Sequence, residues 1–250
     1  MKRFIAKRII SVIPVLIIVS IVIFSLIHLV PGDPATAMLG DLATEEDIAA
    51  LRIRMGLDKP LIEQYFIWIG NIFHGDFGMS VVNNETVGSL IISHIRPTIS
   101  LAIYALVIAA VIAIPLGMIA SRKKGSAIDH VVSVISLAGI SLPSFLLGLF
   151  LMLLFSVKFR IFPVSGYKEI REGFLEHIRS LTLPAIALGF MNAALMMRMT
   201  RASMLEVLGS DYIKMAKAKG VKEFSLLVKH AFKNTLVTLI TIFGQSIVQA

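Results

Sequence analysis

Long apolar runs alternate with short polar stretches along the whole 250-residue chain. A helix needs about 20 apolar residues to cross the hydrocarbon core of a bilayer. Five stretches reach or approach that length: residues 9–30, 97–120, 131–157, 181–197 and 235–250. The third is interrupted by Pro143, and the last is short for a crossing at about 1.5 Å per residue. We therefore predict an all-α, polytopic helical membrane protein with five spans visible, and we expect a sixth span to follow Ala250.

Composition supports this class. Hydrophobic residues make up 56% of the chain and charged residues 16%, against about 25% charged in typical soluble domains. Lysine and arginine exceed aspartate and glutamate by 24 to 16, which in a soluble protein would suggest nucleic-acid binding. In a membrane protein, basic residues instead mark the cytoplasmic loops, so we expect the lipid bilayer and no nucleic acid as a partner. Absence of cysteine excludes disulfides and thiol chemistry.

The distribution of basic residues predicts an orientation. The chain begins with MKRFIAKR and continues into an apolar run that no small-residue cleavage site follows, so we expect a retained anchor rather than a signal peptide. If the N-terminus is cytoplasmic, most lysines and arginines fall in cytoplasmic segments, as the positive-inside rule requires. The stretch 31–96 and the loop 158–180 are then external.

Local signals divide the external stretch into short helices. Thr44 followed by Asp47 resembles an N-cap and a first acidic turn, in a helix that ends at Gly56. The sequence LIEQYFIWIGNIF, residues 61–73, predicts a second, amphipathic helix. We expect these helices to form a small cap on the outer surface. The preceding VPGDP sequence, residues 30–34, is either a structural turn or a contact for an external protein.

The basic segment, residues 209–234, lies between two hydrophobic stretches and has helical periodicity. Ala216 and Gly220 are four residues apart, and on a helix they would leave a small notch that another protein could enter. The alternative is a solvated run of charges. Its lysines outnumber two acidic residues, Asp211 and Glu223, and they are Lys214, Lys217, Lys219, Lys222, Lys229 and Lys233.

Catalytic and metal-binding patterns are missing from the sequence. It contains no HExxH, GxSxG or GxxxxGK[ST] motif, and its six histidines show no ligand spacing, so we predict no catalytic and no metal site. His28 is interpreted as a packed interfacial residue, with a pathway role as the alternative. No acidic or basic residue lies inside a predicted span, which argues against an ion-coupled carrier. Energy for transport would therefore enter from outside the bilayer.

Small and polar residues within the spans allow two readings. Small residues recur every fourth position at Ala105, Ala109, Ala113, Gly117 and Ser121, and again at Ala185, Gly189 and Ala193. Such stripes allow close helix packing in lipid, although they could also line a pathway. The polar residues inside spans could either form interhelical hydrogen bonds or line a translocation pathway, and they are Ser141, Ser144, Asn192 and Gln245.

Four ordered motifs carry a resemblance to a known family. They are IPVLIIVSIVIFSLIHLVPGDPA (13–35), LRIRMGLDKPLIEQYFIWIGNIFHGDFGMS (51–80), ISLPSFLLG (140–148) and AKAKGVKEFSLLVKHAFKN (216–234). Together they cover essentially the whole chain, which resembles the permease subunits of ABC importers for dipeptides, oligopeptides and nickel, specifically the first of two permease types.

The resemblance implies a set of partners and a coupling site. A second permease subunit, two ATP-binding subunits and an external substrate-binding protein would complete the importer in a prokaryotic cytoplasmic membrane. The basic segment is similar to the family's cytoplasmic EAA loop, a coupling helix that fits a cleft of the ATPase, although Lys214 and Met215 differ from the general pattern. The coupling residues carried over are Asp211, Tyr212, Ala216, Ala218, Lys219 and Gly220, with Gly220 ending the helix.

These implications define the expected function. The chain would translocate peptides by alternating access, with no enzyme activity and no cofactor of its own, because ATP would bind to the partner subunits. A nickel or other small-solute importer is the alternative, and a passive channel or an intramembrane enzyme are alternatives of another class. The expected regions are 1–30 (tail and first span), 31–96 (external helical segment) and 97–250 (permease core), the last with a coupling loop at about 199–234.

Overall fold

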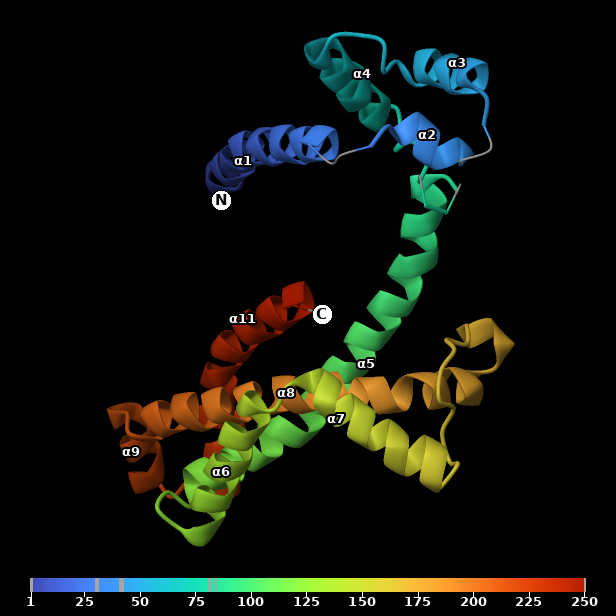
Figure 1. The fold of residues 1–250 in the computed structure, drawn as a ribbon. Helices are drawn as coiled ribbons and strands as arrows, with labels where there is room; N and C mark the ends of the chain where they lie inside the picture. The colour runs from blue at the N-terminus through green and yellow to red at the C-terminus, as the bar shows by residue number, and fades with distance from the viewer. Residues whose placement is uncertain (1, 30–31, 41–42, 81, 84, 250) are drawn as a thin grey trace. The chain divides into compact units, whose positions relative to one another are not determined.

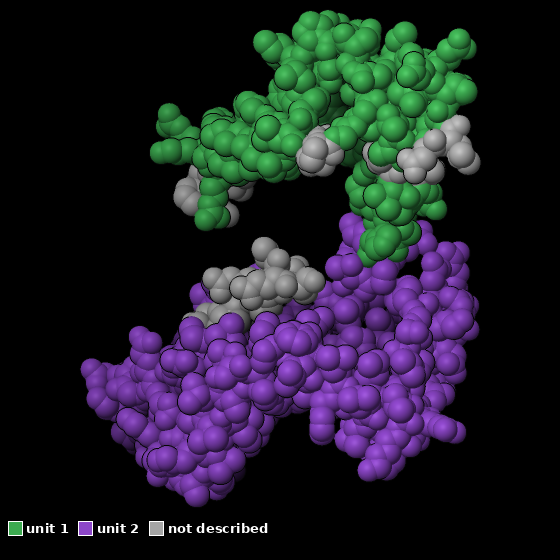
Figure 2. Space-filling model, viewed as in Figure 1, with its two compact units in different colours: residues 1–94 green, residues 95–250 purple. Residues whose placement is uncertain are grey.

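The computed structural model describes residues 2–29, 32–40, 43–80, 82–83 and 85–249. Within these residues the chain is helical and contains no β-strand, with one isolated antiparallel bridge between Met79 and Thr86. The chain divides into two compact units, residues 1–94 and 95–250, which are coloured separately in Figure 2. The all-α class predicted from the hydrophobic pattern is confirmed.

Unit 1 contains α1 (Lys2–Leu29), α2 (Pro34–Leu39), α3 (Glu45–Met55), α4 (Leu61–Phe73) and the start of α5 (Val87–Arg122). The N-cap predicted at Thr44 is confirmed, because the backbone N–H of Asp47 donates to the Thr44 side chain. The Asp47 carboxylate in turn accepts from the backbone N–H of Thr44, which completes a capping box. Gly56 ends α3 in the left-handed conformation, with φ of 72°. Helix α4 covers residues 61–73, as its apolar periodicity predicts.

His28 is exposed on α1, and its contacts lie within unit 1. Its Nδ1 atom lies 2.8 Å from the Phe24 carbonyl oxygen and its Nε2 atom lies 3.1 Å from Gln64 Oε1 on α4. Its ring also lies against the Phe24 ring, with 4.4 Å between the centroids. Both ring nitrogens are therefore engaged within unit 1.

Unit 2 is built around the long helix α8 (Phe174–Leu208). Helices α6 (Ala127–Ser141), α7 (Ser144–Leu151) and α11 (Lys233–Gln249) all contact α8 (Figure 1). The chain also forms a π-helical turn, η1 (Met152–Lys158), a short 3₁₀ turn, η2 (Ile170–Glu172), and the elements of the basic segment. Small and sulfur-containing side chains dominate the buried cluster where α5, α6, α8 and α11 meet, including Ala109, Ala113, Ala193, Met196 and Met197.

The small-residue stripes of α5 and α8 pack the two helices closely together, which confirms the structural interpretation. A Cβ atom added to Gly189 would lie 2.8 Å from the carbonyl oxygen of Ala105. A Cβ atom added to Gly117 would lie 2.8 Å from Cβ of Thr200. Close backbone approach of this kind allows the van der Waals packing that contributes to helix association in lipid. The stripe residues are buried: Ala105, Ala109, Ala113, Gly117, Ser121, Ala185, Gly189 and Ala193.

Three helical stretches within the described residues are long and apolar enough to cross a membrane: Ala6–Leu26, Val87–Arg122 and Phe174–Leu208. The stretch that the sequence predicts as a third span is broken, because Ala127–Ser141 and Ser144–Lys158 meet at an angle of 98°. Pro143 lies at this break, where its ring prevents the preceding residue from continuing a helix. Counted as one broken span, the pair raises the number to four, and α11 has 17 residues.

Candidate functional site

The basic segment folds into α9 (Asp211–Ala218), α10 (Glu223–Ser225) and the π-helical turn η3 (Leu226–Phe232), which continues into α11. Gly220 terminates α9, as predicted: Lys219 is the C-cap, and Gly220 follows it in the left-handed conformation (φ 79°) that glycine adopts without steric cost. The N–H of Gly220 donates to the Lys217 carbonyl at 3.0 Å, and the N–H of Val221 donates to the Ala216 carbonyl at 3.2 Å. This pair of bonds is a Schellman motif, which fixes the direction in which the chain leaves α9.

A separate hydrophobic cluster attaches the basic segment to the end of α8. It contains Met204 of α8, Ile213 of α9 and three residues of the following helical turns, Leu226, Leu227 and Ala231. Met204 and Ala231 are fully buried, and Ile213 is 3% exposed. Because these side chains share one core, α9 and η3 are packed onto α8 and do not form a free loop.

The structure places Ala216 and Gly220, the two residues of the predicted notch, in different surroundings: Ala216 is half-buried and Gly220 is exposed. Ala216 packs against the cluster around Ile213 and Met204, together with Val221. Its face of α9 is therefore turned toward the protein's own core, because Ala216 lies one turn after Ile213. Spacing alone placed Ala216 and Gly220 close together but did not show which side of the helix is buried.

The outer face of α9 is formed by other members of the predicted coupling set. Asp211, Ala218 and Lys219 are exposed, and so is Met215, whose side chain is 58% exposed. Lys214 Nζ lies 2.8 Å from Asp211 Oδ1 at the start of this face. Helix α9 therefore has one face packed against the hydrophobic cluster and an opposite, exposed face that combines small, apolar and charged side chains.

Tyr212 fastens α9 to the chain that follows. Its hydroxyl donates to the carbonyl oxygen of His230 at 2.9 Å and accepts from the side-chain amide of Asn234. The same amide also donates to the His230 carbonyl at 3.1 Å. Tyr212, which the sequence assigned to the coupling surface, therefore connects α9 to the start of α11.

A bidentate ion pair joins the basic segment to the end of α5. Arg122 donates from Nε to Glu223 Oε1 at 2.7 Å and from Nη2 to Oε2 at 2.8 Å. Both side chains are at least half exposed, so the pair fixes geometry more than it adds stability. The hydrogen bonds and positive charge of Arg122 lower the pKa of Glu223, and the charge of Lys217 lowers it further.

This lowered pKa predicts a loss of order in acid. The contribution of the ion pair is present above the ordinary glutamate pKa of 4.5, and it is lost as pH falls through the lower pKa of the folded state. We expect hydrogen exchange of the amides in residues 219–226, corrected for intrinsic rates, to accelerate over that acidic range. Glu223→Gln should show the faster exchange already at neutral pH, whereas Glu206→Gln, an exposed glutamate of α8, should behave as the unmodified chain.

A second, buried ion pair lies at the start of α6. Asp129 is 4% exposed and accepts from Nε and Nη2 of Arg201 on α8, with 2.8 Å between Nη2 and Oδ2. It also accepts from the backbone N–H of Gly125 at 2.9 Å. The carboxylate therefore connects the α5–α6 turn, α6 and α8 at a single point. No sequence motif marked this pair, because the two residues lie far apart in the chain.

The predicted pathway residues have different environments. Ser141 is exposed at the end of α6, and its hydroxyl donates to the Leu137 carbonyl of its own helix at 3.0 Å. Ser144 is half-buried at the start of α7, so the two serines lie on either side of the 98° break. Asn192 is buried on α8, two residues from Ala194, whose methyl group contacts the Gly139 position of α6. The side chain of Gln245 lies outside the described residues.

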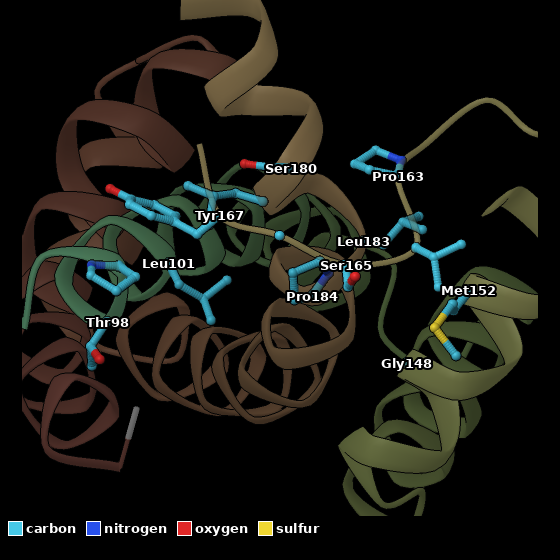
Figure 3. Close-up of a pocket in the computed structure, with 14 residues that line it drawn as sticks. Thr98, Leu101, Gly148, Met152, Pro163, Ser165, Tyr167, Ser180, Leu183 and Pro184 are labelled. Carbon is cyan, nitrogen blue, oxygen red and sulfur yellow. The ribbon is translucent and has the colours of Figure 1, made fainter. Parts of the chain in front are cut away.

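A cavity of about 450 Å³ opens between α5, α7, α8 and the loop that follows η1. None of the predicted pathway residues lines it. Figure 3 shows Thr98, Leu101 and Tyr167 on one side and Gly148 and Met152 on the other. The lining is mainly apolar with a few hydroxyl groups and contains no charged side chain, so the cavity suits an uncharged apolar group. Three prolines, Pro97, Pro163 and Pro184, also line the cavity. They are the sequence feature that could have pointed to irregular helix packing at this place.

The loop over this cavity is held to the helices by polar contacts. His177 Nδ1 lies 2.7 Å from the Lys168 carbonyl oxygen, and Arg179 donates to the Ile161 carbonyl at 2.6 Å. Arg96 of α5 lies 3.5 Å from Glu169. Among the described residues, no group of three or more histidine, aspartate or glutamate side chains is arranged to hold a metal ion. The candidate functional site therefore has two separate parts: the surface helix α9, which is packed onto α8, and the apolar cavity between α5, α7 and α8.

Comparison with protein families gives two matches. Residues 113–250 match a family described as the binding-protein-dependent transport system inner membrane component. Residues 1–102 match the N-terminal part of such a membrane component. The basic segment and the whole of α6, α7 and α8 lie within the first match.

Individual relatives agree with the family matches. The chain is 41% identical, over 98% of its length and 78% of the relative's, to a putative peptide transport system permease protein of Brucella abortus. It is 37% identical to a probable peptide ABC transporter permease protein of Sinorhizobium fredii, over 98% of the chain and 79% of the relative. The same identity and coverage relate it to the di/tripeptide transport system permease protein DppB of Pseudomonas aeruginosa.

Proposed function

Because the chain belongs to the family of inner membrane components of binding-protein-dependent transport systems, we propose that it is the permease subunit of an ATP-driven peptide importer. It is an integral membrane protein of an ABC transporter family. Similarity to peptide permeases over 98% of the chain supports di- or oligopeptides as the cargo. A nickel importer is less favoured, since the relatives' names specify peptides.

The observation that carries the mechanism is the packing of α9. Its exposed face is available to a soluble protein, while its buried face shares a hydrophobic core with Met204 of α8 and the residues of η3. Displacement of α9 by a partner would therefore move the end of α8. Arg122–Glu223 would carry the same displacement to α5. These contacts suit a coupling helix that transmits work from outside the bilayer.

The proposed assembly contains a second permease subunit, two ATP-binding subunits and an external substrate-binding protein. The N-terminus and the basic segment face the cytoplasm of a prokaryotic cell. ATP binds to and is hydrolysed by the partner subunits, so this subunit needs no cofactor. Closure of the ATP-binding subunits pushes on α9, and the helices switch between inward- and outward-facing packings, which is alternating access.

Ala218 offers a direct test of docking. It is exposed on α9 and lies outside the hydrophobic cluster, so Ala218→Glu should leave the fold intact and place a charge where the ATP-binding subunit would dock. We expect the variant to lose co-purification with the ATP-binding subunits and to lose ATP-dependent uptake of a labelled dipeptide in vesicles. Ala218→Ser, at the same position, should retain both activities.

The outcomes separate the parts of the proposal. Unchanged co-purification of Ala218→Glu would show that α9 is not the docking helix. Retained assembly together with uptake that needs no ATP-binding subunit would instead favour a passive channel. Uptake of Ni²⁺ but not of dipeptides by the intact complex would overturn the cargo. Thermal unfolding of both variants must match that of the unmodified chain.

A further inference from the structure

One face of α4 is attached to α1 by polar and aromatic contacts. Ser20 Oγ and Tyr65 Oη are 2.8 Å apart, and the Phe24 ring lies 5.9 Å from the Trp68 ring and 5.4 Å from the Tyr65 ring, between centroids. The contact between His28 and Gln64 continues the same line. The α1 residues are spaced by four, so α4 follows a single side of α1.

The position of these contacts along α1 sets the depth of α4. Ser20 and Phe24 lie within Ala6–Leu26, the stretch of α1 that is apolar enough to cross a membrane. Ser20 precedes Leu26 by six residues, or roughly 9 Å along a helix axis. Helix α4 therefore lies beside the apolar stretch of α1 that is expected to be in the bilayer, and its contacts are not limited to the residues after that stretch.

A second face of α4 is apolar and exposed. Ile62, Phe66 and Phe73 are 75%, 66% and 85% exposed, and spacings of four and seven place them on one side of the helix. Apolar side chains of α1 are exposed as well, among them Leu26 at 55%. The polar side chains of α4 lie elsewhere: Glu63 forms an ion pair with Lys59 at 2.8 Å, and Asn71 is exposed.

We propose that α4 is an interfacial membrane helix whose Ile62, Phe66 and Phe73 side chains insert among lipid acyl chains. The leaflet is the one that surrounds the C-terminal half of α1. Interfacial amphipathic helices bury their apolar face at the boundary between headgroups and acyl chains. Tyrosine and tryptophan, here Tyr65 and Trp68, are enriched at that depth. The helix that the sequence assigns to an external cap is thus partly embedded in the bilayer.

The absence of cysteine makes the test direct. Phe66→Cys and Asn71→Cys place a single fluorescent label on the apolar or the polar side of the same helix, in the full-length chain reconstituted in phosphatidylcholine vesicles. We expect acyl-chain-brominated lipid to quench the label at position 66 and aqueous iodide to leave it unchanged. The label at position 71 should respond in the opposite way. Both variants must keep the thermal unfolding of the unmodified chain.

Native fluorescence gives a second measurement that needs no substitution. Trp68 is the one tryptophan of the chain, and we expect the same brominated lipid to quench it. Quenching of position 66 by iodide would place the face in water. Protection of position 66 from both quenchers would mean that protein covers it, whether a second copy or another subunit. Either result, or a Trp68 signal insensitive to brominated lipid, would overturn the proposal.

Discussion

Gly189→Ala should separate α5 from α8 and destabilise the protein. The added Cβ atom would lie 2.8 Å from the Ala105 carbonyl oxygen, a backbone atom that cannot move without displacing α5. Overpacking in a well-packed core costs about 1–3 kcal/mol, and we expect a value near the upper end because backbone must yield. The measurement is thermal unfolding of the purified chain in detergent, together with the yield of folded protein.

A glycine of the same unit provides the control. A Cβ atom added to Gly148 of α7 would lie 3.6 Å from the Ala187 methyl group, which is ordinary van der Waals contact. Gly148→Ala should therefore unfold at a temperature close to that of the unmodified chain. Equal unfolding temperatures for the two variants would show that α5 and α8 are not in close backbone contact at Gly189.

Arg201→Ala should be the second strongly destabilising change. It leaves the buried Asp129 carboxylate with only the backbone N–H of Gly125 among the hydrogen bonds described above. Removal of one partner from a buried ion pair typically costs about 3–5 kcal/mol, because the remaining charge is not compensated. We expect about 3 kcal/mol, since Arg201 itself is 28% exposed. Chemical or thermal unfolding of the purified chain measures the loss.

A double-mutant cycle separates the ion pair from the packing of its parts. The double variant Asp129→Ala/Arg201→Ala should be less destabilised than the sum of the single variants, because it leaves no unpaired charge. Arg198→Ala, which removes an exposed arginine of the same helix, should have little effect. Additive losses in the cycle would contradict a direct interaction between Asp129 and Arg201.

Features with a local cause were predictable from the sequence. Thr44 and Asp47 specify the start of α3, Gly56 its end and Gly220 the end of α9, because each effect involves neighbours within one helical turn. The apolar period likewise gave the bounds of α4. The small-residue stripes predicted close helix packing, and the structure shows that the α5 and α8 stripes pack against each other.

Features that depend on distant residues were not predictable. Arg122 and Glu223 are 101 positions apart, and Asp129 and Arg201 are 72 positions apart, so no period or motif connects them. The half-buried position of Ala216 could not be predicted for a related reason. Helical spacing identifies residues that share a face, but only the neighbouring Ile213, which is apolar and buried, indicated that this face turns inward. Roles of the coupling and pathway residues stay predictions until the variants are measured.

The shared core of α8, α9 and η3 has a mechanical consequence. The turn at Gly220 and the hydrophobic cluster around Met204 hold α8, α9 and η3 together as one rigid group. A displacement of α9 is therefore passed to α8 without bending within this group. Strain must then be released where helices are joined end to end without a continuous hydrogen-bond ladder. The 98° break at Pro143 between α6 and α7 is such a junction. We therefore expect the angle between α6 and α7 to change during transport while α8, α9 and η3 move as one rigid group.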